Sequence, residues 1–199
     1  MSTLLTDDQI KAAAIANNIE PAALRAVAVV ESGKLGGFLP DGQPVILFEG
    51  HVFWRELVKR NLDPERFKAG NEDILYPSFK GRPPYGPSSA QHGRLQRAAA
   101  INRDAALSSA SWGRFQVMGF NWAICGFQSL QQFINAMYRD EAAHLSAAVE
   151  FIKSNRLMDA LQARDWPAFA RGYNGTEYAA NKYDIRLAEE YARAKREGW

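Results

Sequence analysis

Glu31 is the residue whose surroundings most favour acid–base chemistry. It lies in the last turn of an apolar segment, residues 21–32, which begins with a proline and has the composition of a buried helix. The negative end of the helix dipole and removal from water both disfavour the carboxylate, so we expect a raised pKa for Glu31. An acid that keeps its proton near neutral pH can protonate the leaving oxygen of a glycosidic bond. An exposed position in a frayed last turn is the alternative.

A second carboxylate is expected near Glu31, and two acids compete for that place. Glu49 follows a short apolar run and could activate water or stabilise an oxocarbenium-like transition state. Equally, Glu49 could cap a helix that starts near His51, because a carboxylate is favoured at a helix N-terminus. Asp41 precedes Gly42 in a common turn pair, which favours a structural role for Asp41.

The elements that must position these acids are mostly helices. Alanine-rich segments with helical apolar spacing are frequent and strand signals are scarce, which predicts a mainly α fold with a small β-hairpin. Gly33 is expected to end the second helix, and residues 36–48 are the best hairpin candidate. Residues 71–91 are rich in proline and lack periodicity, so we expect a lid or binding loop there. Helices are predicted over residues 7–17, 21–32, 51–59, 89–108, 129–154, 157–170 and 178–196, with a loop at 109–116.

Length and composition exclude several classes of protein. The chain has 199 residues, of which 47% are hydrophobic and 23% are charged, and this predicts one globular domain over residues 1–199. Lys and Arg number 24 against 22 Asp and Glu, giving a net charge of +2, so we expect no nucleic-acid partner. No apolar stretch is long enough to span a membrane, so no stable membrane insertion is expected. Asp7 and Asp8 argue against a signal peptide.

Metal and thiol chemistry are not expected. Cys125 is the only cysteine and lies among apolar residues, which predicts a buried and inert thiol. His51, His92 and His144 are far apart along the chain and lack the second ligand, three or four residues away, of a helical zinc motif. We therefore predict neither a metal nor an organic cofactor.

Four short motifs follow one another along the chain. Residues 29–33 contain Glu-Ser-Gly at a helix end, and residues 44–53 read Pro-Val-Ile-Leu-Phe-Glu-Gly-His-Val-Phe. Residues 111–119 contain a small-x-Gly-x-x-Gln segment, and residues 172–175 read Gly-Tyr-Asn-Gly. In this order and spacing they resemble the N-acetylmuramidase family of phage endolysins, within the lysozyme-like superfamily. The resemblance covers residues 8–195 and implies a lysozyme-like α+β catalytic domain, with a cleft beside the hairpin and without a separate cell-wall-binding domain.

The resemblance also implies an activity. It predicts a peptidoglycan hydrolase that cleaves the β-1,4 bond between N-acetylmuramic acid and N-acetylglucosamine, with Glu31 as general acid and Glu49 as the candidate second catalytic group. The residues expected to bind substrate are Ser111, Phe115, Gln116, Tyr173 and Asn174. A lytic transglycosylase that uses the same glutamate and a noncatalytic peptidoglycan-binding protein are the alternatives.

The expected partner is the peptidoglycan glycan strand, bound by a monomer. The resemblance implies that the chain is made in the host bacterial cytoplasm and acts on periplasmic peptidoglycan after holin-type permeabilisation of the membrane. Aromatic rings can stack on the apolar faces of sugars, although most aromatic residues are expected in the core. The aromatic candidates for such stacking are Tyr76, Phe79, Tyr85, Trp112 and Phe115.

Overall fold

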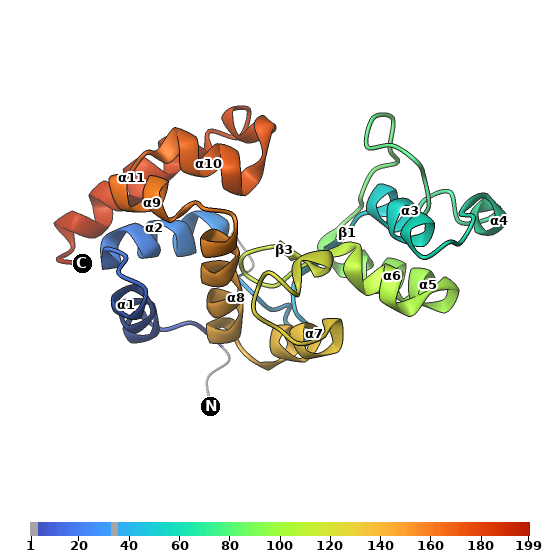
Figure 1. Cartoon of the computed structure of the whole chain (residues 1–199), viewed down its shortest axis with the longest axis horizontal. Coiled ribbons are helices and arrows are strands. Elements are labelled where there is room, and N and C mark those ends of the chain that lie inside the picture. Colours follow the sequence, from blue (N-terminus) through green and yellow to red (C-terminus); the bar gives the residue numbers. More distant parts are fainter. Residues whose placement is uncertain (1–3, 33–35) are drawn as a thin grey trace.

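The structure is a computed structural model that describes residues 4–32 and 36–199. Helices dominate it, and a three-stranded antiparallel sheet lies near its centre (Figure 1). The α-helices are α1 (Asp7–Ala16), α2 (Pro21–Glu31), α3 (Gly50–Lys59), α4 (Glu65–Lys68), α5 (Gln91–Ile101), α6 (Arg103–Ser108), α7 (Leu130–Arg139), α8 (Glu141–Ser154), α9 (Met158–Ala163), α10 (Trp166–Asn174) and α11 (Tyr183–Arg196). The strands are β1 (Ile46–Phe48), β2 (Ala110–Trp112) and β3 (Val117–Met118), and the 3-10 helices are η1 (Ser88–Ala90), η2 (Gly119–Asn121) and η3 (Thr176–Ala179). The prediction of a mainly α fold with a small β component is confirmed.

Two helical lobes flank the sheet. One lobe holds α1, α2 and α8 to α11, and the other holds α3 to α6; the C-terminal end of the chain lies on the side of the first lobe (Figure 1). Helix α2 is central to the first lobe because it packs against α1 and α11 and is apolar nearly all round. The small side chains of its many alanines let those helices approach closely. Helix α2 ends at Glu31, and Gly33, predicted to end it, lies outside the described residues.

The sheet separates its residues onto two faces. The antiparallel register places Leu47 opposite Ser111 and Ser111 opposite Met118, so these three side chains share one face. Glu49, two residues after Leu47, continues that face beyond the end of β1. The alternate residues, with Trp112 among them, are buried in the core on the opposite face. One face of the sheet is therefore available for a functional site.

The predicted hairpin at residues 36–48 is only partly correct. Phe38 and Pro44 form a single antiparallel bridge around the turn, but β1 pairs with β2, far along the chain. Residues 109–116, predicted as a loop, instead provide β2 and the turn into β3. The β2–β3 turn includes Gly113 at φ +68°, where a Cβ atom would lie 2.5 Å from the His144 ring, so a glycine is required there.

Three predicted helices are divided in the structure. Within the predicted helix 157–170, Arg164 and Asp165 separate α9 from α10, and Asp165 accepts a hydrogen bond from the Ala168 N–H. Asn102 separates α5 from α6, and Asp140 separates α7 from α8; each adopts an extended backbone and accepts a hydrogen bond from the first turn of the following helix. The predicted helix 178–196 begins later, at Tyr183. Residues 71–87, which we name the lid segment, are irregular as predicted, and η1 and α5 follow them directly.

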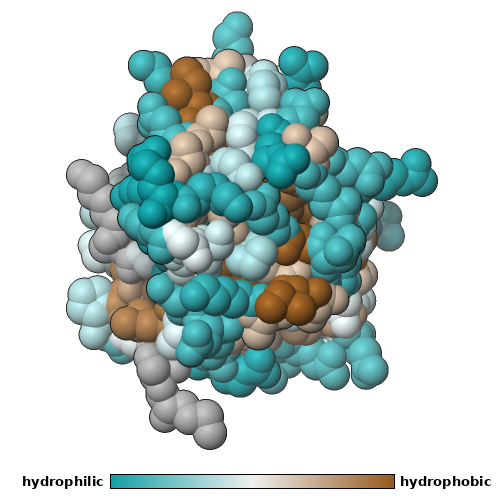
Figure 2. Space-filling model, turned by 90° about the vertical axis from the view of Figure 1, so that its left-hand side faces the viewer, coloured by the Kyte–Doolittle hydropathy of each residue, from teal (hydrophilic) through white to brown (hydrophobic). Residues whose placement is uncertain are grey.

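The face formed by the first lobe is mainly hydrophilic. Figure 2 shows polar residues over most of it, with apolar side chains gathered only in small separate spots. Such scattered exposure is usual for a protein surface. Among the described residues, no helix has the length and apolar character needed to cross a membrane.

Candidate active site

Glu31 lies at the C-terminal end of α2, partly buried in a cleft. Removal from water raises the pKa of its carboxyl to about 7. Two contacts oppose this effect: Asn174 donates from Nδ2 to Glu31 Oε1 at 3.2 Å, and the charge of Arg186 lies nearby. Arg186 also donates to the Val30 carbonyl at 3.0 Å, one of the free carbonyls at the end of α2. The predicted rise in pKa is confirmed, and the frayed, exposed alternative for Glu31 is wrong.

The end of α10 supplies two further cleft residues. Asn174 is its last residue, and Gly175 at φ +81° ends the helix. The Tyr173 ring stacks on Phe169 at 5.5 Å between centroids, and its hydroxyl donates to the Phe115 carbonyl at 3.4 Å. Burial and the nearby carboxylate of Glu31 raise the pKa of Tyr173. The phenol therefore keeps its proton and can act as a hydrogen-bond donor.

Glu49 lies across the cleft on the face of the sheet described above. Its backbone occupies the N-cap position of α3, yet its side chain makes no capping hydrogen bond. Instead, Glu49 Oε2 accepts from the Tyr85 hydroxyl at 3.1 Å and lies 3.5 Å from His51 Nε2. Burial lowers the pKa of His51. The charge of Glu49 acts against this and raises it, while the charges of Arg55 and Arg82 lower it further. The carboxylate of Glu49 thus contacts two side chains beside the cleft and does not cap α3, contrary to the capping interpretation.

Internal hydrogen bonds hold Gln116 and Ser111. Gln116 Oε1 accepts from Ser111 Oγ at 2.7 Å, and its Nε2 donates to the carbonyls of Gly113 at 2.7 Å and Val45 at 3.4 Å. The Gln116 amide therefore stabilises the β2–β3 turn, in which its own backbone has φ +50°. The oxygens of both side chains keep lone pairs that can accept from a sugar hydroxyl.

The cleft has a volume of about 510 Å³ and receives residues from both lobes. All the predicted site residues line it: Glu31, Glu49, Ser111, Phe115, Gln116, Tyr173 and Asn174. The structure thus brings them together, and their roles stay predictions. Sequence reasoning missed other lining residues, among them Leu47, Arg82, Met118 and Asn181. Leu47 and Met118 reach the cleft through the strand register, which only the structure gives, whereas Arg82 lies in the segment predicted as a lid.

The aromatic candidates divide into two groups. Phe79, which is 51% exposed, and Tyr85, which is half-buried, line the cleft from the lid segment. Trp112, Phe115 and Tyr76 are buried in the core, so their rings are not free to stack on a sugar. Phe79 and Tyr85 are therefore the aromatic side chains best placed to meet a saccharide.

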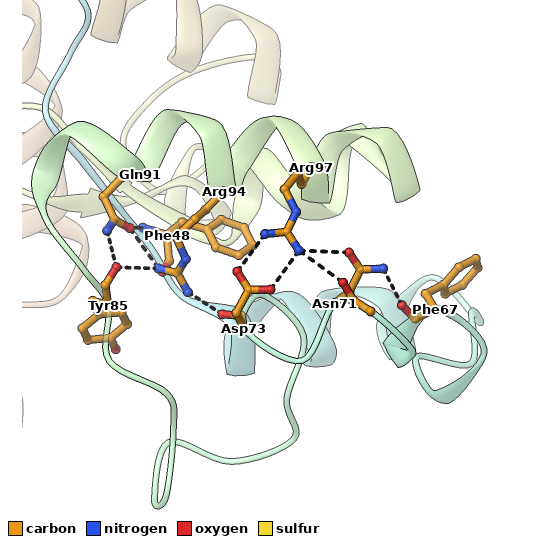
Figure 3. A network of polar contacts seen from close by, with 9 residues as sticks. Phe48, Phe67, Asn71, Asp73, Tyr85, Gln91, Arg94 and Arg97 are labelled. Atoms are coloured by element: carbon orange, nitrogen blue, oxygen red, sulfur yellow. Dashed lines mark hydrogen bonds and ion pairs between the residues drawn. The ribbon is translucent and has the colours of Figure 1, made fainter.

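Two buried side chains of α5 hold both ends of the lid segment (Figure 3). Arg94 donates to the carbonyl of Asp73 at 2.7 Å, at the start of the lid, and to the carbonyl of Tyr85 at 3.4 Å, near its end. Gln91 donates to the same Tyr85 carbonyl at 2.6 Å. Both side chains also bond to the backbone of Phe48, the last residue of β1. The lid and the strand that leads to the second acid are therefore fixed to one helix.

A buried ion pair fixes the other side of the cleft. Glu141, which is fully buried in α8, accepts from Arg114 Nη1 at 2.9 Å and from the backbone N–H groups of Gly37 and Leu5. Arg114, in the β2–β3 turn, donates from Nε to the Ala28 carbonyl at 3.2 Å. The ion pair thus joins the β2–β3 turn to α8 without leaving the buried charge of Glu141 unpaired, and the hydrogen bond to Ala28 joins the same turn to α2.

The described residues contain no group of three metal-ligand side chains. His92 bonds to the Pro44 carbonyl, and His144 bonds to Met137 and to the Arg114 backbone. Cys125 is buried, and burial raises its pKa to about 12, so the thiol is protonated at neutral pH. Asp41 accepts hydrogen bonds from Gln43 within its own turn, as the structural interpretation of that acid requires.

Comparison with known proteins agrees with this geometry. The N-acetylmuramidase family matches the chain over residues 20–195. The chain is also similar to the crystal structure of Burkholderia AP3 phage endolysin, with a TM-score of 0.89 and 37% sequence identity; the match covers 98% of this chain and 73% of the endolysin chain. A comparison with curated proteins gave no match. The chain therefore belongs to the N-acetylmuramidase family and is a glycoside hydrolase that degrades peptidoglycan.

Proposed function

We propose that the chain hydrolyses the β-1,4 bond between N-acetylmuramic acid and N-acetylglucosamine, with Glu31 as general acid. The observation that carries this proposal is the position of Glu31, a carboxyl with a pKa of about 7 in a cleft of about 510 Å³. About half of such carboxyls hold a proton at neutral pH, and that proton can pass to the leaving glycosidic oxygen. Asn174, bonded to Glu31 Oε1, keeps the carboxyl oriented within the cleft.

Glu49 is our candidate for the second catalytic group. Its carboxylate accepts from Tyr85 and retains free lone pairs toward the cleft. In the proposed step, a water oxygen bonds to the anomeric carbon while the bond to the leaving oxygen breaks. Glu31 supplies the proton for that oxygen, and Glu49 accepts the proton from the water. The free enzyme is restored when Glu49 returns its proton to solvent and Glu31 regains one.

The cellular role we propose is that of an endolysin, made in the host bacterial cytoplasm as a monomer and acting on periplasmic peptidoglycan. The similarity to a phage endolysin supports it. The proposal includes passage to the wall through a holin-type membrane lesion. Expression in a Gram-negative host with and without a holin tests this passage. Lysis that requires the holin is expected, and lysis without it would refute the proposed route.

Digestion of purified peptidoglycan tests the chemistry. Soluble fragments are analysed by mass spectrometry before and after borohydride reduction, which marks reducing ends. We expect reducing N-acetylmuramic acid ends from the wild type. Anhydro ends would show a lytic transglycosylase instead, and release of free peptides would place the cleavage outside the glycan strand.

Matched variants test the catalytic roles of Glu31 and Glu49. Glu31→Gln is expected to lower kcat by about a hundredfold or more, the usual effect of removing a general acid. Glu49→Gln is expected to lower kcat with the same products, whereas unchanged kcat would leave Glu49 without a catalytic role. Glu65→Gln is the control, because Glu65 is 60% exposed on α4 and lies outside the cleft. Full activity in Glu31→Gln would refute the assignment.

A further inference from the structure

Arg82 brings a positive charge to the cleft. Its guanidinium carbon lies 3.9 Å from the ring centroid of Phe79 and 4.8 Å from that of Tyr85, both in the lid segment. Among the described residues that line the cleft, it is the only lysine or arginine. Glu31 and Glu49 line the same cleft, so anionic and cationic groups face one shared space.

The guanidinium of Arg82 keeps its hydrogen-bond donors available. Within the described part of the chain it forms no hydrogen bond or ion pair, whereas Arg94 in the same lobe donates to four acceptors. The carboxylate of Glu49 is already bonded to Tyr85 and does not pair with Arg82. Contacts with aromatic faces attract a cation without using its N–H groups. The Arg82 guanidinium is therefore positioned by two aromatic rings, while its N–H groups remain free to bind a ligand.

The lid also fixes the orientation of Arg82. Tyr85, whose ring contacts the guanidinium, is held at its backbone carbonyl by Gln91 and Arg94 and at its hydroxyl by Glu49. Because Tyr85 is held at both its backbone and its hydroxyl, the ring that contacts Arg82 is fixed in place, and binding a ligand there orders little additional chain. A planar guanidinium in such a position suits a carboxylate, which it can bind with two parallel hydrogen bonds.

We propose that Arg82 forms a subsite for a carboxylate carried by the muramic acid residue of the substrate. This inference rests on the proposed function, because it names the substituent that the cleft recognises beside the scissile bond. The carboxylate has two sources in peptidoglycan. In glycan strands stripped of peptide it is the lactyl carboxylate, and in intact strands it belongs to the peptide stem. Both present the same planar anion to the guanidinium.

Binding measurements in a Glu31→Gln background test the proposal without turnover. Isothermal titration calorimetry compares three oligosaccharides of equal length: a peptide-free muramic acid strand, a strand that carries peptide stems, and an N-acetylglucosamine oligomer without carboxylates. Arg82→Ala is expected to weaken binding of one or both carboxylate ligands by about tenfold to a hundredfold, as for loss of a charged hydrogen-bonded pair. Binding of the neutral oligomer should remain within about twofold, and the ligand that loses affinity identifies the source.

Two further variants sharpen the result. Arg82→Lys keeps the charge and loses the planar pair of donors, so we expect an intermediate loss for the same ligand. Arg66→Ala removes an exposed charge on α4, away from the cleft, and should leave all three affinities unchanged. An equal loss for all three ligands in Arg82→Ala, or no loss for any, would overturn the proposal. Failure of the proposed function would appear separately, in the products of wild-type digestion.

Discussion

Replacing Glu31 by glutamine tests the cause of its raised pKa through stability. Burial raises the pKa from the ordinary value of 4.5 to about 7, so between these values the folded chain holds a proton that the unfolded chain has lost. The free energy of unfolding therefore falls as the pH rises from about 4.5 to about 7, and levels off above that. At about 1.4 kcal/mol per unit of pKa, the ionisable carboxyl costs about 3 kcal/mol at pH 8.

Glu31→Gln removes this dependence and retains an oxygen that can accept from Asn174. Relative to the wild type, we expect the variant to gain about 3 kcal/mol at pH 8 and little at pH 4. Urea unfolding followed by tryptophan fluorescence at both pH values measures the difference. Glu65→Gln, at an exposed acid, should show no such dependence on pH. An equal effect at both pH values, or a loss of stability at pH 8, would refute the reasoning.

Two further predictions concern activity. Asn174→Ala removes a hydrogen bond that favours ionised Glu31, so the alkaline limb of the profile of kcat against pH should move up by about 0.7 pH unit. Asn181→Ala is the control, because Asn181 is a cleft amide without that bond, and its alkaline limb should stay in place. A downward shift in Asn174→Ala would contradict the assigned contact. Tyr85→Phe removes the donor to Glu49, and steady-state kinetics should show kcat lowered by about tenfold with KM little changed. Unchanged kcat would mean that this contact does not orient a catalytic group.

Local signals in the sequence predicted most helices and the principal acid. Thr6 caps α1 through a capping box, a local pattern in which Gln9 lies three residues beyond Thr6. The apolar run after Pro21 predicted both the central helix and the buried setting of Glu31, since its composition left no polar face for solvent. Asn102 and Asp140 divide helices that apolar spacing alone had joined, although both are typical capping residues.

The sheet depended on contacts between distant parts of the chain. Residues 109–116 resemble a loop because serine, alanine and glycine recur among them, but residues 110–112 pair with β1 and Trp112 is buried in the core beneath the sheet. That pairing places Ser111 beside Leu47 on the cleft face. A strand pattern of two or three residues is too short to indicate such a partner in the sequence.

The sequence by itself determined which chemical groups are present and where the helices that carry them lie. Only the tertiary structure decided how Glu49 and Arg82 face the cleft, because the contacts that orient them come from the lid segment and from α5. It also decided the pKa of Glu31, which depends on burial and on Asn174, more than a hundred residues away. Proton affinity and charge recognition depend on distance and solvent exposure, and folding alone sets both.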